Sequence, residues 1–390
     1  MQAEIERIHR LALSRPWRIS PKIVIALFAL LMLTPLAMQI AGQGPGSSGE
    51  NRNLAPFPTI SNLYSIETLS RRLEQYVGDH FGLRDEMVRA NAIFRYRFGL
   101  STNPQVAIGL DGWLFYTADQ IMEQHVGVDV FSPSELEQWV ARMGENRAWL
   151  AERGIPFVMM VAPEKSTIYP ELIPQFSRRS GTTTRVDQIV ERLKGTDFEF
   201  IDPREAIIAA KPTRSDLYYK TDSHWSQQGA FIAYEMLMDH LQERYPDLPR
   251  AHLSDYGITT APLPIDLVYL LGLQDVIVPE GEILTRKPPV NILGAEIRLD
   301  KDTPPFWGWP VKFYETRLRD APRALVFGDS FTDYILGPSF LYESFRDPIF
   351  THHNNGTFNF ELVKEVEPDI VIVVLAERYL KNIPWQPVGF

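Results

Sequence analysis

The stretch Ala324-Leu325-Val326-Phe327-Gly328-Asp329-Ser330-Phe331 decides the fold class, because an apolar run ends in a turn and then leads into a helical pattern. A short apolar run between turn signals is typical of a strand that is buried on both faces of a parallel sheet. Gly328 permits the tight turn, and Ser330 is then expected near the N-terminus of the following helix. Reactive groups in open parallel sheets gather at the carboxyl ends of the strands. Ser330 is therefore either a nucleophile or only a cap of that helix.

The rest of the chain repeats this alternation of apolar strands and amphipathic helices. Strands are predicted by apolar runs at 112–116, 156–161, 198–201, 323–327 and 370–375. Helices are predicted by helical apolar spacing and by cap signals at 61–77, 84–98, 133–153, 183–194, 226–244, 333–345 and 358–366, with a further short helix before 226. This order implies an α/β fold with a mainly parallel sheet flanked by helices. The stretch 250–310 is rich in proline and is expected to be irregular, either an insertion or a loop region that caps the site.

The composition is that of a folded protein and excludes several classes of function. Of the 390 residues, 45% are hydrophobic and 23% are charged, which rules out a mostly disordered chain. At roughly 150 residues per domain, the length allows two or three domains or one large α/β domain. The formal net charge of −10 argues against nucleic acid as the main partner. The absence of cysteine excludes disulfides, zinc–thiolate sites, iron–sulfur clusters and cysteine nucleophiles.

One segment near the N-terminus, Ile23 to Ile40, is long and apolar enough to cross a membrane. It carries no charged residue, and a transmembrane helix needs about 20 apolar residues. The alternatives are a cleaved signal peptide, for which no good cleavage site follows, and a buried core helix. The preceding residues are rich in arginine, which keeps them cytoplasmic, so the expected location is the bacterial inner membrane, with the rest of the chain on the trans side, which is the periplasm if the source is a Gram-negative bacterium. We predict a cytoplasmic segment at 1–22, a transmembrane anchor at 23–41, a linker at 42–60 and a periplasmic domain at 61–390.

A second polar stretch, Tyr218 to Ser226, contains an acid and a histidine two residues apart, Asp222 and His224. Side chains at i and i+2 of an extended segment point the same way, and an acid beside an imidazole fixes its tautomer and stabilises its protonated form. The alternative is that Asp222 or Ser223 starts the following helix. A metal site is less favoured, because no third ligand is evident. Together with Ser330, the pair meets the residue requirements of a Ser-His-Asp site.

Several short motifs occur along the chain: ENRNLAPFP at 50–58, DHFGLR at 79–84, DGWLFY at 111–116, APEKSTIYPE at 162–171, DSHW at 222–225 and GDSF at 328–331. In these motifs and their order, most of residues 50–390 resembles the AlgX/AlgJ-type alginate O-acetyltransferases. The resemblance implies an SGNH-hydrolase-like domain in which Asp222 is the acid, His224 the base and Ser330 the nucleophile. The family's permuted order, with the Asp-His motif before the serine, is matched here.

The resemblance also implies an activity, which is transfer of acetyl groups to hydroxyls of an exopolysaccharide in the periplasm through an acetyl-serine intermediate. It implies a membrane-bound O-acyltransferase partner that supplies acetyl groups, together with other exopolysaccharide biosynthesis subunits. We expect no cofactor and no metal. Two alternatives stay open, namely an acetylesterase of the same polymer and a non-catalytic scaffold subunit of an export complex. The polymer is alginate, acetylated cellulose or another exopolysaccharide; an acidic chain binds a polyuronate only through a locally basic groove.

Further polar residues are expected near the site on weaker grounds. Lys165 and Ser166 follow one predicted strand, and Glu377 and Arg378 follow the last one, so each pair either lines the cleft or belongs to a solvated turn. Tyr334 lies one helical turn after the candidate nucleophile, which is expected to bring it to the mouth of the cleft. The remaining candidates are an oxyanion donor at Asn354 or Asn355 and sugar-stacking or core tryptophans at Trp307, Trp309 and Trp385.

Overall fold

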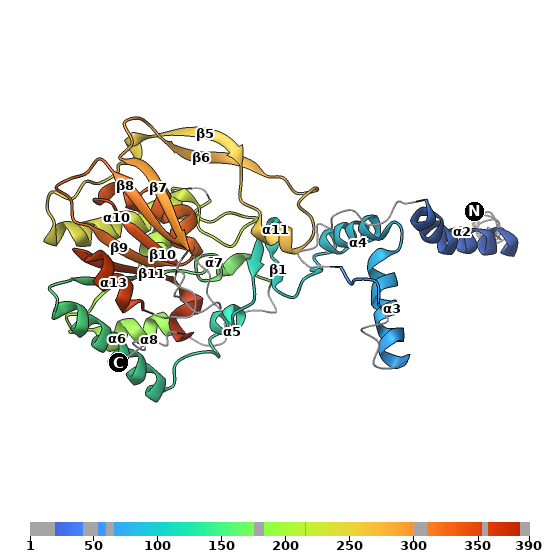
Figure 1. Cartoon of the computed structure of the whole chain (residues 1–390), viewed down its shortest axis with the longest axis horizontal. Helices are drawn as coiled ribbons and strands as arrows, with labels where there is room; N and C mark the ends of the chain where they lie inside the picture. Colours follow the sequence, from blue (N-terminus) through green and yellow to red (C-terminus); the bar gives the residue numbers. More distant parts are fainter. Residues whose placement is uncertain are drawn as a thin grey trace, which may run out of the picture. The chain divides into compact units, whose positions relative to one another are not determined.

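The computed structural model describes residues 20–41, 54–59, 66–174, 183–214, 216–299, 310–352 and 358–382 (Figure 1). The chain divides into two compact units, Met1–Arg97 and Phe98–Phe390. The described part of the first unit is mainly helical, with α2 (Pro21–Ile40), α3 (Ile66–His80) and α4 (Arg84–Arg97). Helix α4 matches its prediction to within one residue. Helix α3 ends later than predicted, and most of the predicted linker lies outside the described residues.

Helix α2 is the apolar segment near the N-terminus. Its 20 residues give a length of about 30 Å, which is the thickness of the hydrocarbon core of a bilayer. Large apolar side chains along it are exposed, and within the described residues it is the one helix long and apolar enough to cross a membrane. A signal sequence near an N-terminus passes the same test of length and composition.

The second unit is built on a seven-stranded sheet in the order β4-β3-β11-β9-β10-β8-β7. The first five strands are parallel, whereas β8 is antiparallel to β10 and β7 is antiparallel to β8. The mainly parallel sheet predicted from the sequence is therefore confirmed, and β7, β8 and β10 are strands that the prediction missed. The strands are β3 (Phe157–Ala162), β4 (Glu199–Ile201), β7 (Ile292–Leu299), β8 (Pro310–Thr316), β9 (Ala324–Gly328), β10 (Ile349–His352) and β11 (Ile370–Ala376).

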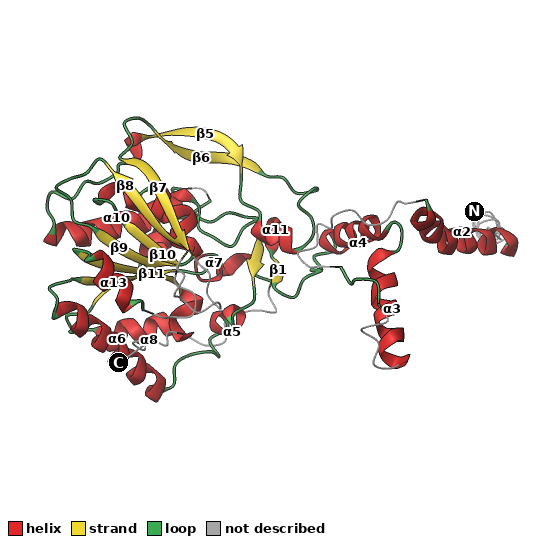
Figure 2. Cartoon of the chain, in the orientation of Figure 1, coloured by secondary structure: helices red, strands yellow, loops and turns green. Residues whose placement is uncertain are grey.

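Helices cover both faces of this sheet, which explains why its central strands are apolar throughout (Figure 2). Successive side chains of a strand point to opposite faces, so Val158 and Met160 of β3 join one hydrophobic core while Met159 and Val161 join the other. The first core includes α10 (Gln227–Arg244). The second core includes α6 (Pro133–Ala151), α8 (Arg185–Leu193) and α13 (Phe360–Val366).

Helix α6 shows how closely local signals determine these elements. Ser132 accepts a hydrogen bond from the backbone of Glu135, and the Glu135 side chain accepts one from the backbone of Ser132, which is a capping box.

Shorter elements complete the unit around the sheet. They are β1 (Val106–Ile108), β2 (Leu114–Tyr116), α5 (Ile121–His125), α7 (Lys165–Ile168), α9 (Arg204–Ala210) and α12 (Gly337–Ser339).

The stretch 250–310 is more regular than predicted over its described residues. Strands β5 (Tyr256–Pro262) and β6 (Glu280–Arg286) pair as an antiparallel ribbon (Figure 1). The short helix α11 (Asp266–Leu270) lies in the segment that connects the two strands. Most side chains of the ribbon are exposed or half-buried, so the strands lack the apolar alternation that reveals a half-buried strand. The prediction of an irregular region was therefore wrong, because a two-stranded exposed ribbon leaves little hydrophobic pattern.

Candidate active site

The turn after β9 presents Ser330 at the carboxyl edge of the sheet. A Cβ atom added at Gly328 would lie 2.6 Å from both Cβ and Oγ1 of Thr332, so this close approach requires glycine. Asp329 Oδ1 accepts a hydrogen bond from the backbone of Phe331 at 2.9 Å, and Oδ2 accepts one from the backbone of Ala376, at the end of β11, at 2.6 Å. Asp329 thus fastens the turn to the neighbouring strand and fixes the position of Ser330.

The helix that follows is less regular than the predicted helix at 333–345. The helical stretch runs over 330–339, Thr332–Leu336 within it has π-helical geometry, and a separate 3-10 turn covers Leu341–Ser344. Single π-helical turns inside helices are frequent at functional sites. Tyr334 lies on this turn, where the residue is 60% exposed and its ring centroid is 5.5 Å from that of His224.

Asp222 and His224 lie on a tight loop that an antiparallel bridge between Tyr218 and Trp225 closes. Asp222 Oδ1 accepts from the backbone N–H of His224 at 3.0 Å and lies 2.7 Å from His224 Nδ1. His224 Nε2 lies 2.7 Å from Ser330 Oγ. The side chains of Asp222, His224 and Ser330 therefore form one hydrogen-bonded chain, although 106 residues separate the histidine from the serine.

The geometry excludes the alternative that this loop serves as a helix cap. The N-cap of α10 is Ser226, whose hydroxyl accepts from the backbone of Gly229 at 3.3 Å. Asp222 instead accepts a hydrogen bond from His224, and the Ser223 hydroxyl donates to Asp266.

The electrostatics of Asp222 determine which nitrogen of His224 carries the proton. Burial alone would raise the pKa of Asp222, but the hydrogen bond and charge of His224 lower it to about 2. An ionised carboxylate only accepts hydrogen bonds, so it selects the tautomer with the proton on Nδ1. Nε2 is then free to accept the proton of Ser330.

Lys165 does not line an open cleft and is not part of a solvated turn. Its side chain is buried, and Nζ donates to the carbonyls of Leu114 at 2.5 Å and Tyr219 at 2.8 Å. Burial lowers the pKa of Lys165 to about 7, while the carboxylates of Asp222 and Asp266 raise it. The amine therefore supports the Asp222–His224 loop from within the protein.

Glu377 and Arg378 are likewise held inside the protein. The Glu377 carboxylate accepts from Thr167 Oγ1 at 2.7 Å and from the backbone of Glu164 at 3.2 Å. Arg378 Nε lies 2.9 Å from Glu164 Oε1 in a buried ion pair. These groups thus build a polar framework at the ends of β3 and β11. Ser166, which is also buried, lines a cavity of about 90 Å³ beside Glu377.

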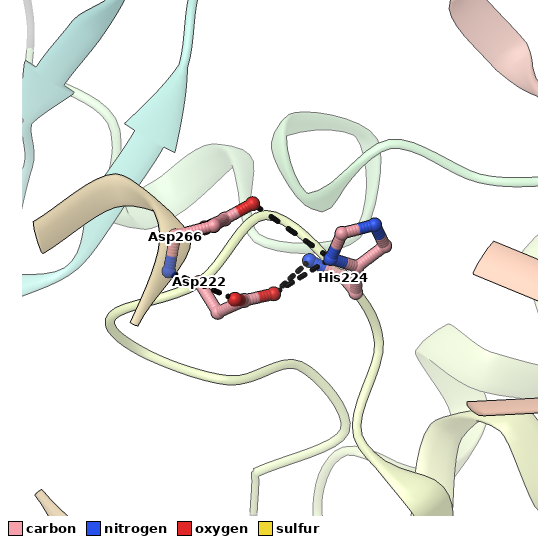
Figure 3. A group of neighbouring side chains, drawn as sticks. All are labelled: Asp222, His224 and Asp266. Atoms are coloured by element: carbon pink, nitrogen blue, oxygen red, sulfur yellow. Dashed lines mark hydrogen bonds and ion pairs between the residues drawn. The ribbon is translucent and has the colours of Figure 1, made fainter. Parts of the chain in front are cut away.

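Asp266 is the residue of this site that sequence reasoning missed. It begins α11, and its Oδ2 atom lies 3.8 Å from His224 Nδ1. Figure 3 shows Asp266 and Asp222 both directed at this ring nitrogen. Nothing in its sequence context signals the contact, because Asp266 lies 44 residues from Asp222 in the proline-rich stretch.

Asp222, His224 and Asp266 also form a group whose composition could hold a metal ion, with ligand atoms within 4.8 Å of one another. Asp222 Oδ1 and His224 Nδ1, however, are hydrogen-bonded to each other at 2.7 Å, which leaves neither free for coordination. The geometry therefore fits an acid–base pair better than a metal centre. The other sequence candidates lie outside the described residues, namely Trp307, Trp309, Asn354, Asn355 and Trp385.

Comparison with known proteins agrees with this fold. Residues 106–287 match the family model described as "SGNH hydrolase-like domain, acetyltransferase AlgX". The matched region contains Asp222 and His224 and ends before Ser330. Among solved structures, Bacillus cereus PatB1 with a sulfonyl adduct is similar, with a TM-score of 0.50 and 18% identity, covering 72% of this chain and 97% of that one.

Two curated relatives share one description and have low sequence identity to this chain. The probable alginate O-acetylase AlgJ of Pseudomonas putida is 23% identical over 238 residues, which are 60% of this chain and 59% of the relative. The protein of the same description from Pseudomonas aeruginosa is 25% identical over 178 residues, 45% of this chain and 43% of the relative. The chain thus spans about half the length of the curated relatives it matches.

Proposed function

We propose that this chain is an O-acetyltransferase that modifies hydroxyls of an alginate-like exopolysaccharide, and the match of residues 106–287 to the SGNH hydrolase-like domain model and the AlgJ relatives support the proposal. The observation that carries this proposal is the hydrogen-bonded chain in which Ser330 Oγ lies 2.7 Å from His224 Nε2 and His224 Nδ1 lies 2.7 Å from Asp222 Oδ1. A serine hydroxyl is a weak nucleophile until a neighbouring base takes its proton. The same chain of contacts argues against a non-catalytic scaffold.

The first half of the reaction would load the serine. Ser330 Oγ attacks the carbonyl carbon of an acetyl donor while its proton passes to His224 Nε2. The negative charge that develops on the carbonyl oxygen lies near the start of the helical stretch at 330–339, where a helix N-terminus favours it. The bond to the donor's leaving group then breaks, the leaving group takes the proton from His224, and acetyl-Ser330 remains.

The second half would deliver the acetyl group. A sugar hydroxyl attacks acetyl-Ser330 and gives its proton to His224, and Ser330 departs with that proton as the ester bond to the sugar forms. Tyr334 lies on the exposed side of His224 and offers a ring against which a sugar can pack. Water in place of the sugar would give net acetylesterase activity.

The N-terminal helix supports a location for this chemistry. We propose that residues 23–41 anchor the chain in the bacterial inner membrane, with 1–22 in the cytoplasm, 42–60 as a linker and 61–390 in the periplasm. Helix α2 has the length and composition that such an anchor needs. A membrane-bound O-acyltransferase would supply acetyl groups, and other exopolysaccharide biosynthesis subunits would be neighbours in the membrane.

The test uses the full-length protein in detergent micelles with nitrophenyl acetate as donor and alginate oligosaccharides as acceptor. Mass spectrometry of the sugars detects acetyl transfer, and absorbance detects donor cleavage. Wild type and the surface control Ser134→Ala should produce acetylated sugar, whereas Ser330→Ala should produce none. Donor cleavage without any acetylated sugar would assign an acetylesterase instead. Activity of Ser330→Ala equal to that of wild type would remove the basis of the proposed site.

A further inference from the structure

Asp266 holds the Asp222–His224 loop through several atoms at once. Its backbone N–H donates to Asp222 Oδ2 at 3.0 Å, the oxygen that His224 does not use. Its carboxylate accepts from the backbone N–H of Ser223 at 2.8 Å and from the Ser223 hydroxyl. Both oxygens of Asp222 are therefore occupied, one by the histidine and one by the segment that carries Asp266.

The segment around Asp266 is itself fastened to its surroundings. Thr221 Oγ1 donates to the carbonyl of Pro264 at 3.0 Å, which adds a second link between this segment and the loop. At the other end of α11, Asn103 Nδ2 donates to the carbonyl of Leu270 at 3.1 Å. Helix α11 is thus tied on one side to the Asp222–His224 loop and on the other to the turn before β1.

We propose that Asp266 is a positioning residue for the acid–base pair of this site. It holds Asp222 in the orientation that binds His224 Nδ1, and it keeps a second negative charge beside the imidazole. The proposal deepens the function proposed above and rests on it. Asp266 acts through Asp222 and His224 rather than on the reacting atoms.

The charge of Asp266 changes within the pH range in which such a site works. Burial and the negative charge of Asp222 raise the pKa of Asp266 to about 6, while His224 lowers it. Lys165 on α7 and Tyr334 on the π-helical turn are further titratable groups that act on this pair. The Asp266 side chain is 39% exposed, so solvent weakens its effect on the imidazole without abolishing it.

Substitution of Asp266 by asparagine keeps the shape of the side chain and removes its charge. The protonated imidazole that forms in the reaction then has one stabilising anion fewer beside it. The acid limb of Ser330 reactivity should therefore move to lower pH, by at most about one unit because Asp266 is itself partly protonated over this range. The plateau rate should fall about tenfold, less than for loss of the triad acid itself, because Asp222 remains in place.

The test measures how fast phenylmethanesulfonyl fluoride labels the full-length protein in detergent micelles, followed by intact mass as a function of pH. Labelling forms a bond between Ser330 Oγ and the sulfonyl sulfur, releases fluoride and passes the hydroxyl proton to His224. Asp275→Asn, which removes one exposed negative charge from the same segment, is the charge-matched control. Ser223→Ala removes one hydrogen bond to Asp266 and leaves its charge.

The proposal predicts a lower plateau and a shifted acid limb for Asp266→Asn, and recovery of the limb in Asp266→Glu. It predicts a small loss of rate without a shift for Ser223→Ala, and wild-type behaviour for Asp275→Asn. An Asp266→Asn profile with an unshifted limb would overturn the proposal, whatever its rate, because a merely structural role loses rate without moving the limb. Ser330→Ala labelled as fast as wild type, or a wild type that is not labelled, would instead remove the proposed nucleophile and the role of Asp266 with it.

Discussion

Two groups of buried polar residues lie at the same carboxyl edge of the sheet and are used in opposite ways. The reactive group consists of Asp222, His224 and Ser330. Its hydrogen bonds form a chain, at one end of which the half-buried Ser330 hydroxyl donates to His224. The framework group consists of Glu164, Lys165, Thr167, Glu377 and Arg378. Within it Arg378 pairs with Glu164, Lys165 donates to backbone carbonyls, and Glu377 accepts from the Thr167 hydroxyl and from a backbone N–H. Burial does not distinguish the groups, since His224 is 7% and Glu377 is 3% exposed.

The difference between the groups lies in where their hydrogen bonds end. The contacts of the framework group lie within the protein and leave little for a substrate. In the reactive group the Ser330 side chain is half-buried, and Tyr334 beside this group is 60% exposed. A substitution in the reactive group should therefore lower the reaction rate and leave the free energy of unfolding nearly unchanged. A substitution in the framework group should lower the free energy of unfolding and leave the rate nearly unchanged.

The largest expected effect is on rate and comes from Asp222→Asn. The amide no longer enforces the tautomer with the proton on Nδ1, and the rate of nitrophenyl acetate cleavage should fall about 10³- to 10⁴-fold. Asp239→Asn, an exposed aspartate on α10, is the control and should retain the wild-type rate. A loss of less than tenfold in Asp222→Asn would show that Asp222 does not orient the base.

The second effect is on stability and comes from Arg378→Met in the framework group. It removes the partner of the buried Glu164 carboxylate, which should lower the free energy of unfolding by about 3 kcal/mol in urea titrations followed by tryptophan fluorescence. The cleavage rate per folded molecule should stay within about threefold of wild type. Full stability with lost activity in Arg378→Met would show instead that Arg378 acts in the reactive group.

A third effect concerns the pH dependence of stability. Burial raises the pKa of Glu164 to about 7, with Arg378 opposing and Glu377 adding to the rise. A carboxyl with a raised folded pKa contributes stability that is complete below its ordinary pKa of about 4.5 and is lost as pH rises through about 7. Glu164→Gln should therefore show a shallower decline of unfolding free energy over this window than wild type. Parallel curves for the two proteins would contradict the assignment.

The smallest effect is expected from Tyr334→Ala. Because Tyr334 is 60% exposed, the free energy of unfolding should change by less than about 0.5 kcal/mol. KM for an oligosaccharide acceptor should rise by about three- to tenfold, since a stacking contact contributes roughly 1 kcal/mol, while cleavage of nitrophenyl acetate stays near the wild-type rate. Tyr334→Phe is the matched control and should keep the acceptor KM. An unchanged KM in Tyr334→Ala would exclude Tyr334 from the acceptor site.

The sequence predicted those features that depend on strong local signals. The strand that ends at Gly328 and the capped helix after Ser132 were found close to their predicted positions, because apolar runs and cap residues determine them locally. Residue chemistry and a family resemblance named Asp222, His224 and Ser330 as candidates for one site. Their proximity was not given by the sequence and comes from the structure.

The missed features depend on contacts between distant parts of the chain. Lys165 and Glu377 each follow a strand, as residues that line a cleft do. Their hydrogen bonds show instead that they are buried: Lys165 donates to the carbonyls of Leu114 and Tyr219. Glu377 accepts from the hydroxyl of Thr167. Asp266 belongs to none of the sequence motifs. Its backbone N–H and its carboxylate hydrogen-bond to the loop that carries Asp222, which lies 44 residues away in the sequence. The spacing of residues in the sequence does not predict a contact of this kind.

The central claim is that His224 activates Ser330 to carry an acetyl group, and acid-quenched mass spectrometry tests it most directly. The full-length protein is mixed with nitrophenyl acetate, quenched in acid and digested, and the peptide that contains Ser330 is examined for the mass of one acetyl group. The account predicts an acetylated Ser330 in wild type and its loss in His224→Ala at the same pH. An acetyl group found only on other residues, or an equal yield at Ser330 without His224, would contradict it.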